Sequence, residues 1–278
     1  MILTGNAKLA GVIGWPVSHS LSPRLHGYWL QQHRIDGAYL PLPVRPEALS
    51  PVVASLAELG FRGINVTIPH KEAILKLCTE LDATAERIGA VNTVVFRDGE
   101  LYGSNSDAFG FIENLYQGAP NWKPAAGPAV VLGAGGAARA VIVALLDAGV
   151  PSLHLVNRTL ARAEELAEAF GDKVQPHPWD DAAEAFFGAS LLVNSTSLGM
   201  TGQRDLDLDL EGLPRSALVT DLVYSPLETS LLAAAKARGN AVVDGLGMLL
   251  HQARPGFEAW FGLQPIVSED LRHFVLAP

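Results

Sequence analysis

The sequence has almost no cysteine and no long hydrophobic run, and its basic residues are in the minority. Cys78 is the single cysteine among 278 residues, so an intramolecular disulfide is impossible and a secreted, disulfide-stapled fold is excluded. No apolar run reaches the roughly 18 to 20 residues that cross a membrane. The first residues also lack the charged and apolar regions of a signal peptide. We therefore expect a cytoplasmic protein with no membrane partner.

The deficit of basic residues argues against binding to nucleic acid. Twenty Lys and Arg against 29 Asp and Glu give a formal net charge of −9 at pH 7, whereas proteins that neutralise nucleic-acid phosphates carry basic surfaces. A phosphorylated small ligand stays compatible, since it needs only a local pair of cations. The eight histidines show neither an H-E-x-x-H pattern nor cysteine-paired spacing, so we expect no metal site.

Short apolar runs alternate with helix-length segments, which predicts an α/β fold with two domains. In the first part the pattern predicts strands at 9–14, 38–42 and 63–68, helices at 24–33 and 46–59, and a hairpin that turns at 97–99. In the second part it predicts strands at 129–132, 152–156, 191–194, 218–221 and 241–244, helices at 137–148 and 160–170, and a last helix at 248–261. Residues 117–128 carry three prolines and two glycines, which marks a boundary nearby.

This rhythm predicts how the chain is organised. An N-terminal α/β domain should cover residues 1–112 and be completed by the C-terminal helices at 246–278. A Rossmann-like domain with a doubly wound parallel sheet should cover residues 113–245.

The first chemical motif is a glycine-rich turn between a strand and a helix. Gly133, Ala134, Gly135, Gly136 and Ala137 follow the strand at 129–132 in a G-x-G-G-x-A pattern. Glycine permits the tight turn and lets the backbone approach a pyrophosphate, and the following helix N-terminus offers N–H groups to it. Alone, such a turn is as compatible with an ordinary strand–helix connection as with a nucleotide site.

The end of the next strand favours NADP over NAD. NAD enzymes carry a carboxylate there for the ribose 2′-hydroxyl, but this chain has Asn157, Arg158 and Thr159, with Arg162 one turn further on. Two arginines select an anion such as a 2′-phosphate. We expect Arg158 and Arg162 to share a helix face; the alternative is a solvated basic turn.

The first domain offers candidate substrate and catalytic residues. Asn65 and Thr67 should point to one face of the strand at 63–68, since side chains alternate along a strand. Lys71 falls at the start of the next helix, where a cation opposes the helix dipole. It is a catalytic candidate or a surface lysine, and Asp107 is a catalytic candidate or a helix N-cap.

Taken together, the motifs resemble the shikimate dehydrogenase family. The matching segments occur in the family's order over nearly the whole chain: 18–23, 65–71, 89–93, 105–107, 133–138, 157–159, 194–200, 221–226 and 245–253. One departure is Ser106, where the family usually has threonine. The resemblance implies NADPH-dependent, reversible reduction of 3-dehydroshikimate to shikimate in aromatic amino-acid and chorismate biosynthesis.

The resemblance also implies roles for single residues. Lys71 and Asp107 match the catalytic pair. Residues that match substrate contacts are Ser18 and Ser20 for the carboxylate, Asn65, Thr67, Asn92, Asp107 and Gln252 for the ring hydroxyls, and Tyr224 nearby. Residues that match the nicotinamide pocket are Thr196, Leu222, Gly245 and Met248.

Other functions stay open. A quinate/shikimate or amino-shikimate dehydrogenase and a catalytically silent NADP-binding protein are the alternatives; the presence of both Lys71 and Asp107 argues against the silent protein. The sequence is compatible with a monomer and with a homodimer, and no apolar stripe decides between them.

Overall fold

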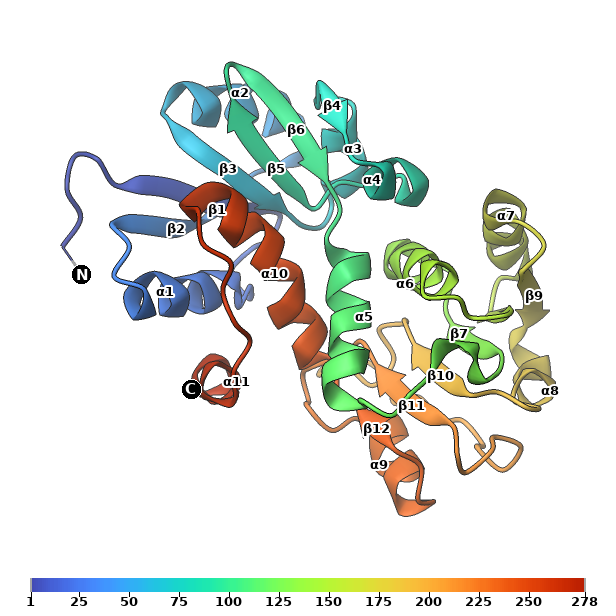
Figure 1. Cartoon of the computed structure of the whole chain (residues 1–278). Helices are drawn as coiled ribbons and strands as arrows, with labels where there is room; N and C mark the ends of the chain where they lie inside the picture. Colours follow the sequence, from blue (N-terminus) through green and yellow to red (C-terminus); the bar gives the residue numbers. More distant parts are fainter. Residues whose placement is uncertain (1, 278) are drawn as a thin grey trace. The chain divides into compact units, whose positions relative to one another are not determined.

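A computed structural model of the chain describes residues 2–277, which form two compact units (Figure 1). Unit 1 contains the residues up to Ser106 and those from Leu250 onward. Unit 2 contains Asp107–Leu249. Both units are α/β structures, so the predicted fold class is confirmed. Residues 1 and 278, which end the predicted domains, lie outside the described residues.

Unit 1 is built on a mixed six-stranded sheet in the order β2-β1-β3-β5-β6-β4. The strands are β1 (Lys8–Gly14), β2 (Gly37–Pro43), β3 (Phe61–Val66), β4 (Glu80–Leu81), β5 (Thr93–Arg97) and β6 (Glu100–Ser104). The helices are α1 (Ser22–Gln32), η1 (Pro46–Ala48), α2 (Leu49–Glu58), α3 (Lys71–Leu75), α4 (Ala83–Ile88), α10 (Leu246–Phe261), which starts in unit 2, and α11 (Glu269–Leu276). Strands β5 and β6 pair antiparallel around the predicted turn, in which Asp98 and Gly99 both adopt positive φ.

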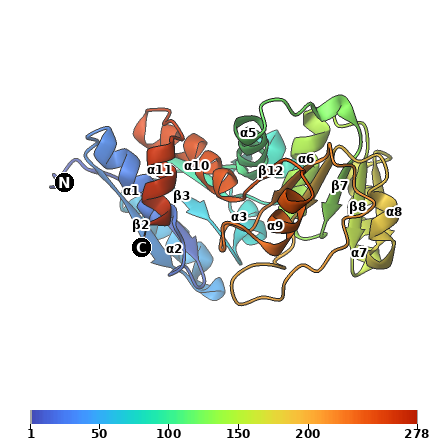
Figure 2. The same cartoon turned by 90° about the horizontal axis from the view of Figure 1, so that it is seen from below.

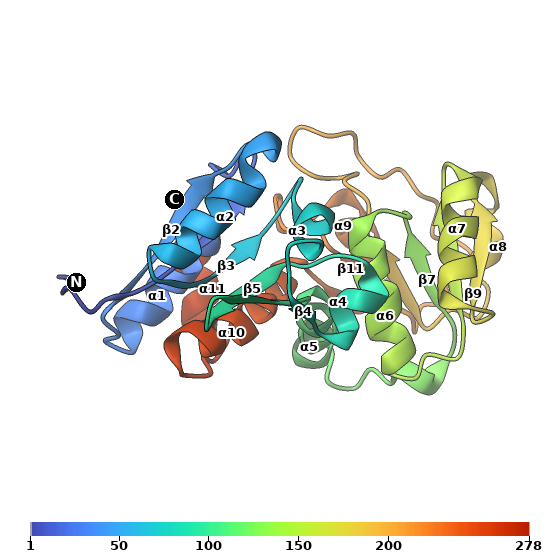
Figure 3. The same ribbon diagram turned by 90° about the horizontal axis from the view of Figure 1, so that it is seen from above.

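Two apolar layers cover the sheet of unit 1. Aliphatic side chains of α2, α3 and α4 pack on one face, around Val53, Ile64 and Ile74. Aromatic rings of α1 and α10 gather on the opposite face, where Trp29 lies 5.2 Å from Phe257 between ring centroids. Figure 3 shows α2 and α10 on opposite sides of this sheet, and Figure 2 shows α1 and α11 side by side.

Unit 2 contains a parallel six-stranded sheet in the order β12-β11-β10-β7-β8-β9. The strands are β7 (Ala129–Leu132), β8 (Leu153–Asn157), β9 (Val174–Pro178), β10 (Leu191–Asn194), β11 (Leu218–Asp221) and β12 (Val242–Val243). The helices are α5 (Asp107–Gly118), η2 (Pro124–Ala126), α6 (Gly136–Asp147), α7 (Leu160–Phe170), η3 (Trp179–Asp181), α8 (Ala182–Ala185) and α9 (Ser230–Ala237). Numbered from β7, this order is 3-2-1-4-5-6, the doubly wound arrangement of dinucleotide-binding folds.

The boundaries of the units differ from those predicted. They fall at 106/107 and 249/250 instead of 112/113 and 245/246. Helix α5 packs against α6 and β12, so the entire helix belongs to unit 2. The proline-rich segment at 117–128 follows that helix and therefore marks its end, not the end of the first unit.

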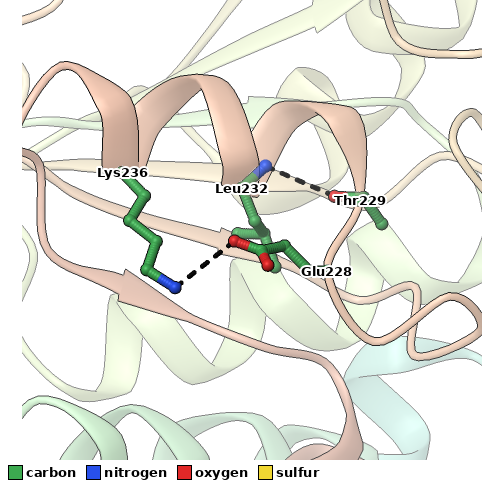
Figure 4. A network of polar contacts seen from close by, with 4 residues as sticks. All are labelled: Glu228, Thr229, Leu232 and Lys236. Atoms are coloured by element: carbon green, nitrogen blue, oxygen red, sulfur yellow. Dashed lines mark hydrogen bonds and ion pairs between the residues drawn. The ribbon is translucent and has the colours of Figure 1, made fainter.

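The side chains that start α9 show how its position is fixed (Figure 4). Thr229 is the N-cap, and its Oγ1 accepts the Leu232 N–H at 3.4 Å. The same hydroxyl donates to Asp221 Oδ2 at 2.7 Å, which ties the helix to the end of β11. Lys236 and Glu228 add an ion pair of 3.4 Å, but both side chains are largely exposed, so the pair adds little stability.

Two local predictions are wrong. Strand β3 ends at Val66, and Thr67 lies beyond it, in the turn that leads toward α3, where its carbonyl accepts the His70 N–H at 2.9 Å. Arg158 lies in the turn before α7, whose N-cap is Thr159, so it does not share a helix face with Arg162.

Within residues 2–277, no helix is both long and apolar enough to cross a membrane. Over the same residues, no three His, Cys, Asp or Glu side chains are grouped so as to hold a metal ion.

Candidate functional site

A cavity of about 560 Å³ lies at the carboxyl ends of the strands of unit 2. Its lining comes from the turns after β7, β8, β9 and β10, and consists of Gly133, Ala134, Gly135, Asn157, Arg158, Arg162, Trp179, Ser195, Thr196, Ser197, Leu198, Asp205, Leu206 and Asp207. Ligands bind doubly wound sheets at this edge, where the strand order reverses between the first and fourth strands. Here that point lies between β7 and β10.

The glycine turn leaves backbone open to the cavity. Gly133 has φ +99°, and a Cβ there would lie 2.8 Å from Thr196 Cγ2, so only glycine fits. A Cβ on Gly135 or Gly136 would meet no atom within 4 Å. Gly135 precedes α6 without a side-chain cap, and the helix N-terminus therefore keeps N–H groups for an anion.

Two arginines face this cavity without protein partners. Arg158 and Arg162 are both exposed, and neither side chain makes a hydrogen bond or ion pair within the described residues. Asn157 is held by its own turn, since its Nδ2 donates to Thr159 O at 2.7 Å. Although Arg158 is not helical, Arg158 and Arg162 both line this cavity, which is compatible with a site for a 2′-phosphate.

The side chains of Asn194 and Asp221 form a buried hydrogen-bonded pair beside the cavity. Asn194 Oδ1 accepts from both the N–H and the hydroxyl of Thr196, at 3.0 and 2.7 Å. Asn194 Nδ2 donates to Asp221 Oδ1 at 2.9 Å. Burial raises the pKa of Asp221, against hydrogen bonds from Thr229, Val223 and Asn194 that lower it. The pair thus fixes Thr196 at the cavity.

Other predicted cofactor residues lie outside this lining. Gly136 and Ala137 form the first turn of α6, and Thr159 lies next to Arg158. Gly245 lies against Leu222, since a Cβ there would be 2.4 Å from Leu222 O. Met248 is in the first turn of α10. Tyr224, which was predicted to lie near the substrate, is also outside this lining; it is partly buried, and that burial raises its pKa.

A second polar cluster lies in unit 1, between the sheet and α10. Asn65, on β3, donates from Nδ2 to Asn92 O and to Thr93 Oγ1, both at 3.1 Å. Asn92 Nδ2 donates to Gln252 Oε1 at 3.4 Å. The Ser106 hydroxyl donates to Gln252 O at 2.7 Å. Three side-chain amides are therefore brought together by direct contacts.

The loop with Ser18 and Ser20 and the turn with Thr67 lie next to each other, at the carboxyl ends of β1 and β3. Residues 15–21 follow β1, and Thr67 follows β3, the parallel neighbour of β1. Backbone bonds join the two segments, from Trp15 N to Ile68 O and from Thr67 N to Ile13 O, both at 3.0 Å. Ser18 is exposed, and Ser20 is partly buried with its Oγ accepting from Ser22 N.

Lys71 is the first residue of α3, as predicted. The preceding His70 is buried, and its Nε2 lies 2.7 Å from Val44 O. Lys71 O accepts the Val91 N–H at 2.8 Å, so backbone contacts hold the lysine on both sides. Asp107 directly follows Ser106 and is the first residue of α5.

The sequence did not point to several residues in these two places. In unit 1 they are Tyr39 and Thr93, and in unit 2 they are Trp179, Ser195, Ser197, Leu198, Asp205, Leu206 and Asp207. The polar end of the strand at 191–194 was a usable signal for Ser195 and Ser197. The loop at 205–207 had none, because it belongs to no regular element.

The reversed strand order, the glycine turn and the unpartnered arginines define a dinucleotide-binding fold with a place for a phosphate. Comparison with known families gives the particular one. The family described as "Shikimate dehydrogenase substrate binding domain" matches residues 12–94, and "Shikimate / quinate 5-dehydrogenase" matches residues 123–201.

Similarity to characterised proteins extends over the full length. The chain is 62 % identical over 276 residues to shikimate dehydrogenase (NADP(+)) of Paramagnetospirillum magneticum, covering 99 % of this chain and 100 % of the relative. The crystal structure of shikimate 5-dehydrogenase from Thermus thermophilus with NADP(H) and shikimate has a TM-score of 0.86 and 41 % identity, covering 96 % and 98 % of the chains. Quinate dehydrogenase from Corynebacterium glutamicum with NAD has a TM-score of 0.90 and 32 % identity, covering 97 % and 99 %. The chain belongs to the shikimate dehydrogenase family.

Proposed function

We propose that this chain is an NADP-dependent oxidoreductase that reversibly reduces 3-dehydroshikimate to shikimate, a step of aromatic amino-acid and chorismate biosynthesis. The observation that carries the substrate is the cluster of three carboxamides, Asn65, Asn92 and Gln252, in unit 1. Carboxamides both donate and accept, which suits neighbouring ring hydroxyls. Relatives named shikimate dehydrogenase (NADP(+)) at 62 and 61 % identity support the same activity.

The proposal assigns substrate binding and cofactor binding to different units of the chain. Unit 1 binds substrate and carries Lys71, and unit 2 binds NADP. Ser18 and Ser20 bind the substrate carboxylate. Residues proposed for the ring and its hydroxyls are Asn65, Thr67, Asn92, Tyr224 and Gln252, and Lys71 and Asp107 are the catalytic pair.

Reduction of a ketone requires a hydride at carbon and a proton at oxygen. NADPH, when bound, supplies the hydride. The Lys71 ammonium donates a proton to the carbonyl oxygen and stabilises the negative charge that develops there. Asp107 orients the lysine and accepts a hydrogen bond from a neighbouring ring hydroxyl. The amide cluster holds the ring so that the reacting atoms stay aligned.

The residues of unit 2 fit NADP. The open glycine backbone binds a pyrophosphate, and the unpartnered guanidinium groups of Arg158 and Arg162 bind a 2′-phosphate. Gly133, Ala134, Gly135, Gly136, Ala137, Asn157, Thr159, Thr196, Leu222, Gly245 and Met248 are the other residues proposed for the cofactor.

Replacing Arg158 by alanine is expected to weaken NADP binding by about ten- to a hundredfold, since a hydrogen bond to a charged group contributes about 1.5–3 kcal/mol. Binding of NAD, which lacks the phosphate, should change little. Calorimetric titration of both nucleotides measures this difference. Arg139→Ala is the control, because Arg139 lies on α6 outside the cavity lining. Equal losses for NADP and NAD would contradict the 2′-phosphate assignment.

A single assay tests the proposed activity. Shikimate and quinate are each combined with NADP and with NAD, and NAD(P)H absorbance is followed. Turnover confined to shikimate with NADP is expected. Comparable rates with quinate or NAD would instead assign the chain to the quinate branch, which the likeness to quinate dehydrogenase makes the second candidate. Nucleotide binding without turnover would indicate a silent NADP-binding protein.

We also propose that the enzyme works in the cytoplasm as a monomer or a homodimer. Sedimentation analysis of the purified chain distinguishes the two states.

A further inference from the structure

A directed series of hydrogen bonds leads from Tyr39 to the amides of unit 1. The Tyr39 hydroxyl donates to Asn65 Oδ1 at 2.7 Å, and Asn65 Nδ2 donates to Thr93 Oγ1 at 3.1 Å. The Thr93 hydroxyl then donates to Asn92 Oδ1 at 3.0 Å. The Tyr39 hydroxyl thus fixes the orientation of the Asn65 amide, whereas Asn92 Oδ1 is also held by the Ser106 N–H at 2.9 Å. Tyr39, Asn65, Asn92 and Thr93 are each at most 6 % exposed, so bulk water competes little for these hydrogen bonds.

This arrangement decides what Asn65 presents to a ligand. Both hydrogens of its Nδ2 are used by protein acceptors, Asn92 O and Thr93 Oγ1. Its Oδ1 has two lone pairs and accepts one bond from Tyr39. The remaining lone pair is the part of the side chain with capacity for a ligand, and it suits a ring hydroxyl that donates.

Tyr39 is itself held rigidly. Its ring stacks on His26 with centroids 3.9 Å apart and planes 3° from parallel. His26 is packed in turn against Trp29, Phe257 and Trp260. Burial raises the pKa of Tyr39 well above its usual value, so the phenol stays protonated and remains a donor. On the sheet, Tyr39 pairs with Ala10 and Asn65 with Val12, two residues further along β1, which places both side chains on the same face.

We propose that Tyr39 is a positioning residue for substrate binding, which holds the Asn65 amide so that its oxygen accepts a hydroxyl of the substrate ring. Tyr39 acts only through Asn65. This role rests on the proposed function, because it requires that Asn65 contacts the substrate.

The variant Tyr39→Phe tests the role. It keeps the ring stacked on His26 and removes only the donor, so the amide plane is held from its nitrogen side alone. The KM for shikimate should rise about three- to tenfold, as expected for one hydrogen bond. The kcat and the KM for NADP should change by much less. Tyr28→Phe is the matched control, since Tyr28 contacts Phe274 and lies outside the series.

Combination with Asn65→Ala separates positioning from general damage. The double variant Tyr39→Phe, Asn65→Ala should have the same KM for shikimate as Asn65→Ala alone, because the amide that Tyr39 positions is already absent. Purely structural damage would lower the unfolding midpoint and would raise the KM for shikimate further in the Asn65→Ala background. An unchanged KM in a folded Tyr39→Phe protein would overturn the proposal.

A second variant keeps the test valid if Tyr39→Phe does not fold. Thr93→Val breaks the next step of the series and should raise the KM for shikimate to a similar extent; an unchanged value would overturn the proposal. The wild-type chain gives the reference: absence of shikimate turnover there refutes the proposed function, whereas normal turnover with insensitive variants refutes only the role of Tyr39.

Discussion

Replacing Lys71 by alanine is expected to lower kcat about a hundredfold or more, the usual size of a general-acid contribution. The KM for shikimate should change far less, because the lysine acts on charge that develops during the reaction and not on the bound ketone. Steady-state kinetics in both directions, at saturating NADP or NADPH, measure the effect. Backbone contacts hold residue 71 through His70 and Val91, so the truncation should leave α3 in place.

Lys76→Ala is the matched control for this experiment. Lys76 is an exposed lysine that follows α3 at its other end, so its loss removes the same charge from the same short helix. Its kcat should match the wild type. A large rise in KM with unchanged kcat in Lys71→Ala would instead make Lys71 a residue that binds substrate without acting as the acid.

The stability of unit 1 is expected to fall steeply in mild acid because two of its histidines are buried uncharged. Burial lowers the pKa of His26 to about 3 and, together with Arg254 and Arg272, lowers the pKa of His251 to about 4. Below the ordinary histidine pKa, the unfolded chain binds a proton at each site that the folded chain does not. The free energy of unfolding should therefore decrease by about 1.4 kcal/mol per histidine on going from neutral pH to about pH 5.5, or about 3 kcal/mol for both.

Urea titrations at a series of pH values measure this loss. His26→Phe should halve the pH dependence, and the fold should tolerate the change since neither ring nitrogen of His26 makes a hydrogen bond within the described residues. The exposed His33, changed to glutamine, should leave the pH dependence as it is. A free energy of unfolding that stays constant over this range would show that both histidines keep ordinary pKa values.

Features that depend on a short stretch of sequence were predicted, whereas features that depend on contacts between distant segments were not. Most strands of unit 2 and its helices α6 and α7 were predicted closely because short apolar runs alternate with helical segments there, and β10, β11 and α7 have the predicted bounds. The end of β3 was not predicted, because the chain turns at Thr67, whose carbonyl accepts the His70 N–H, while the apolar pattern continues to residue 68. Strand β9 was missed since its sequence, Val-Gln-Pro-His-Pro, carries two prolines and only its place at the sheet edge tolerates them.

The site followed the same rule. The glycine turn and the arginines stand in short motifs, so the sequence identified them. Tyr39 looked like any aromatic residue of a buried strand, and only its pairing across β1 brings it to Asn65. Trp179 lines the cavity because β9 pairs with β8, which places it after Pro178, the partner of Asn157. Contacts of this kind depend on strand register, which composition and periodicity do not determine.

The buried pair of Asn194 and Asp221 has a consequence for tolerance to acid and base. An aspartate at position 194 would keep the acceptor for Thr196 but would bring two carboxyl groups within 2.9 Å of each other. One of them would then have to retain a proton, and the shape of the nucleotide-binding loop would follow its titration. Leucine would keep the size but leave Thr196 without its acceptor. A carboxamide serves both neighbours without itself taking up a proton, so the position of Thr196 depends on one titratable group, Asp221, and not on two.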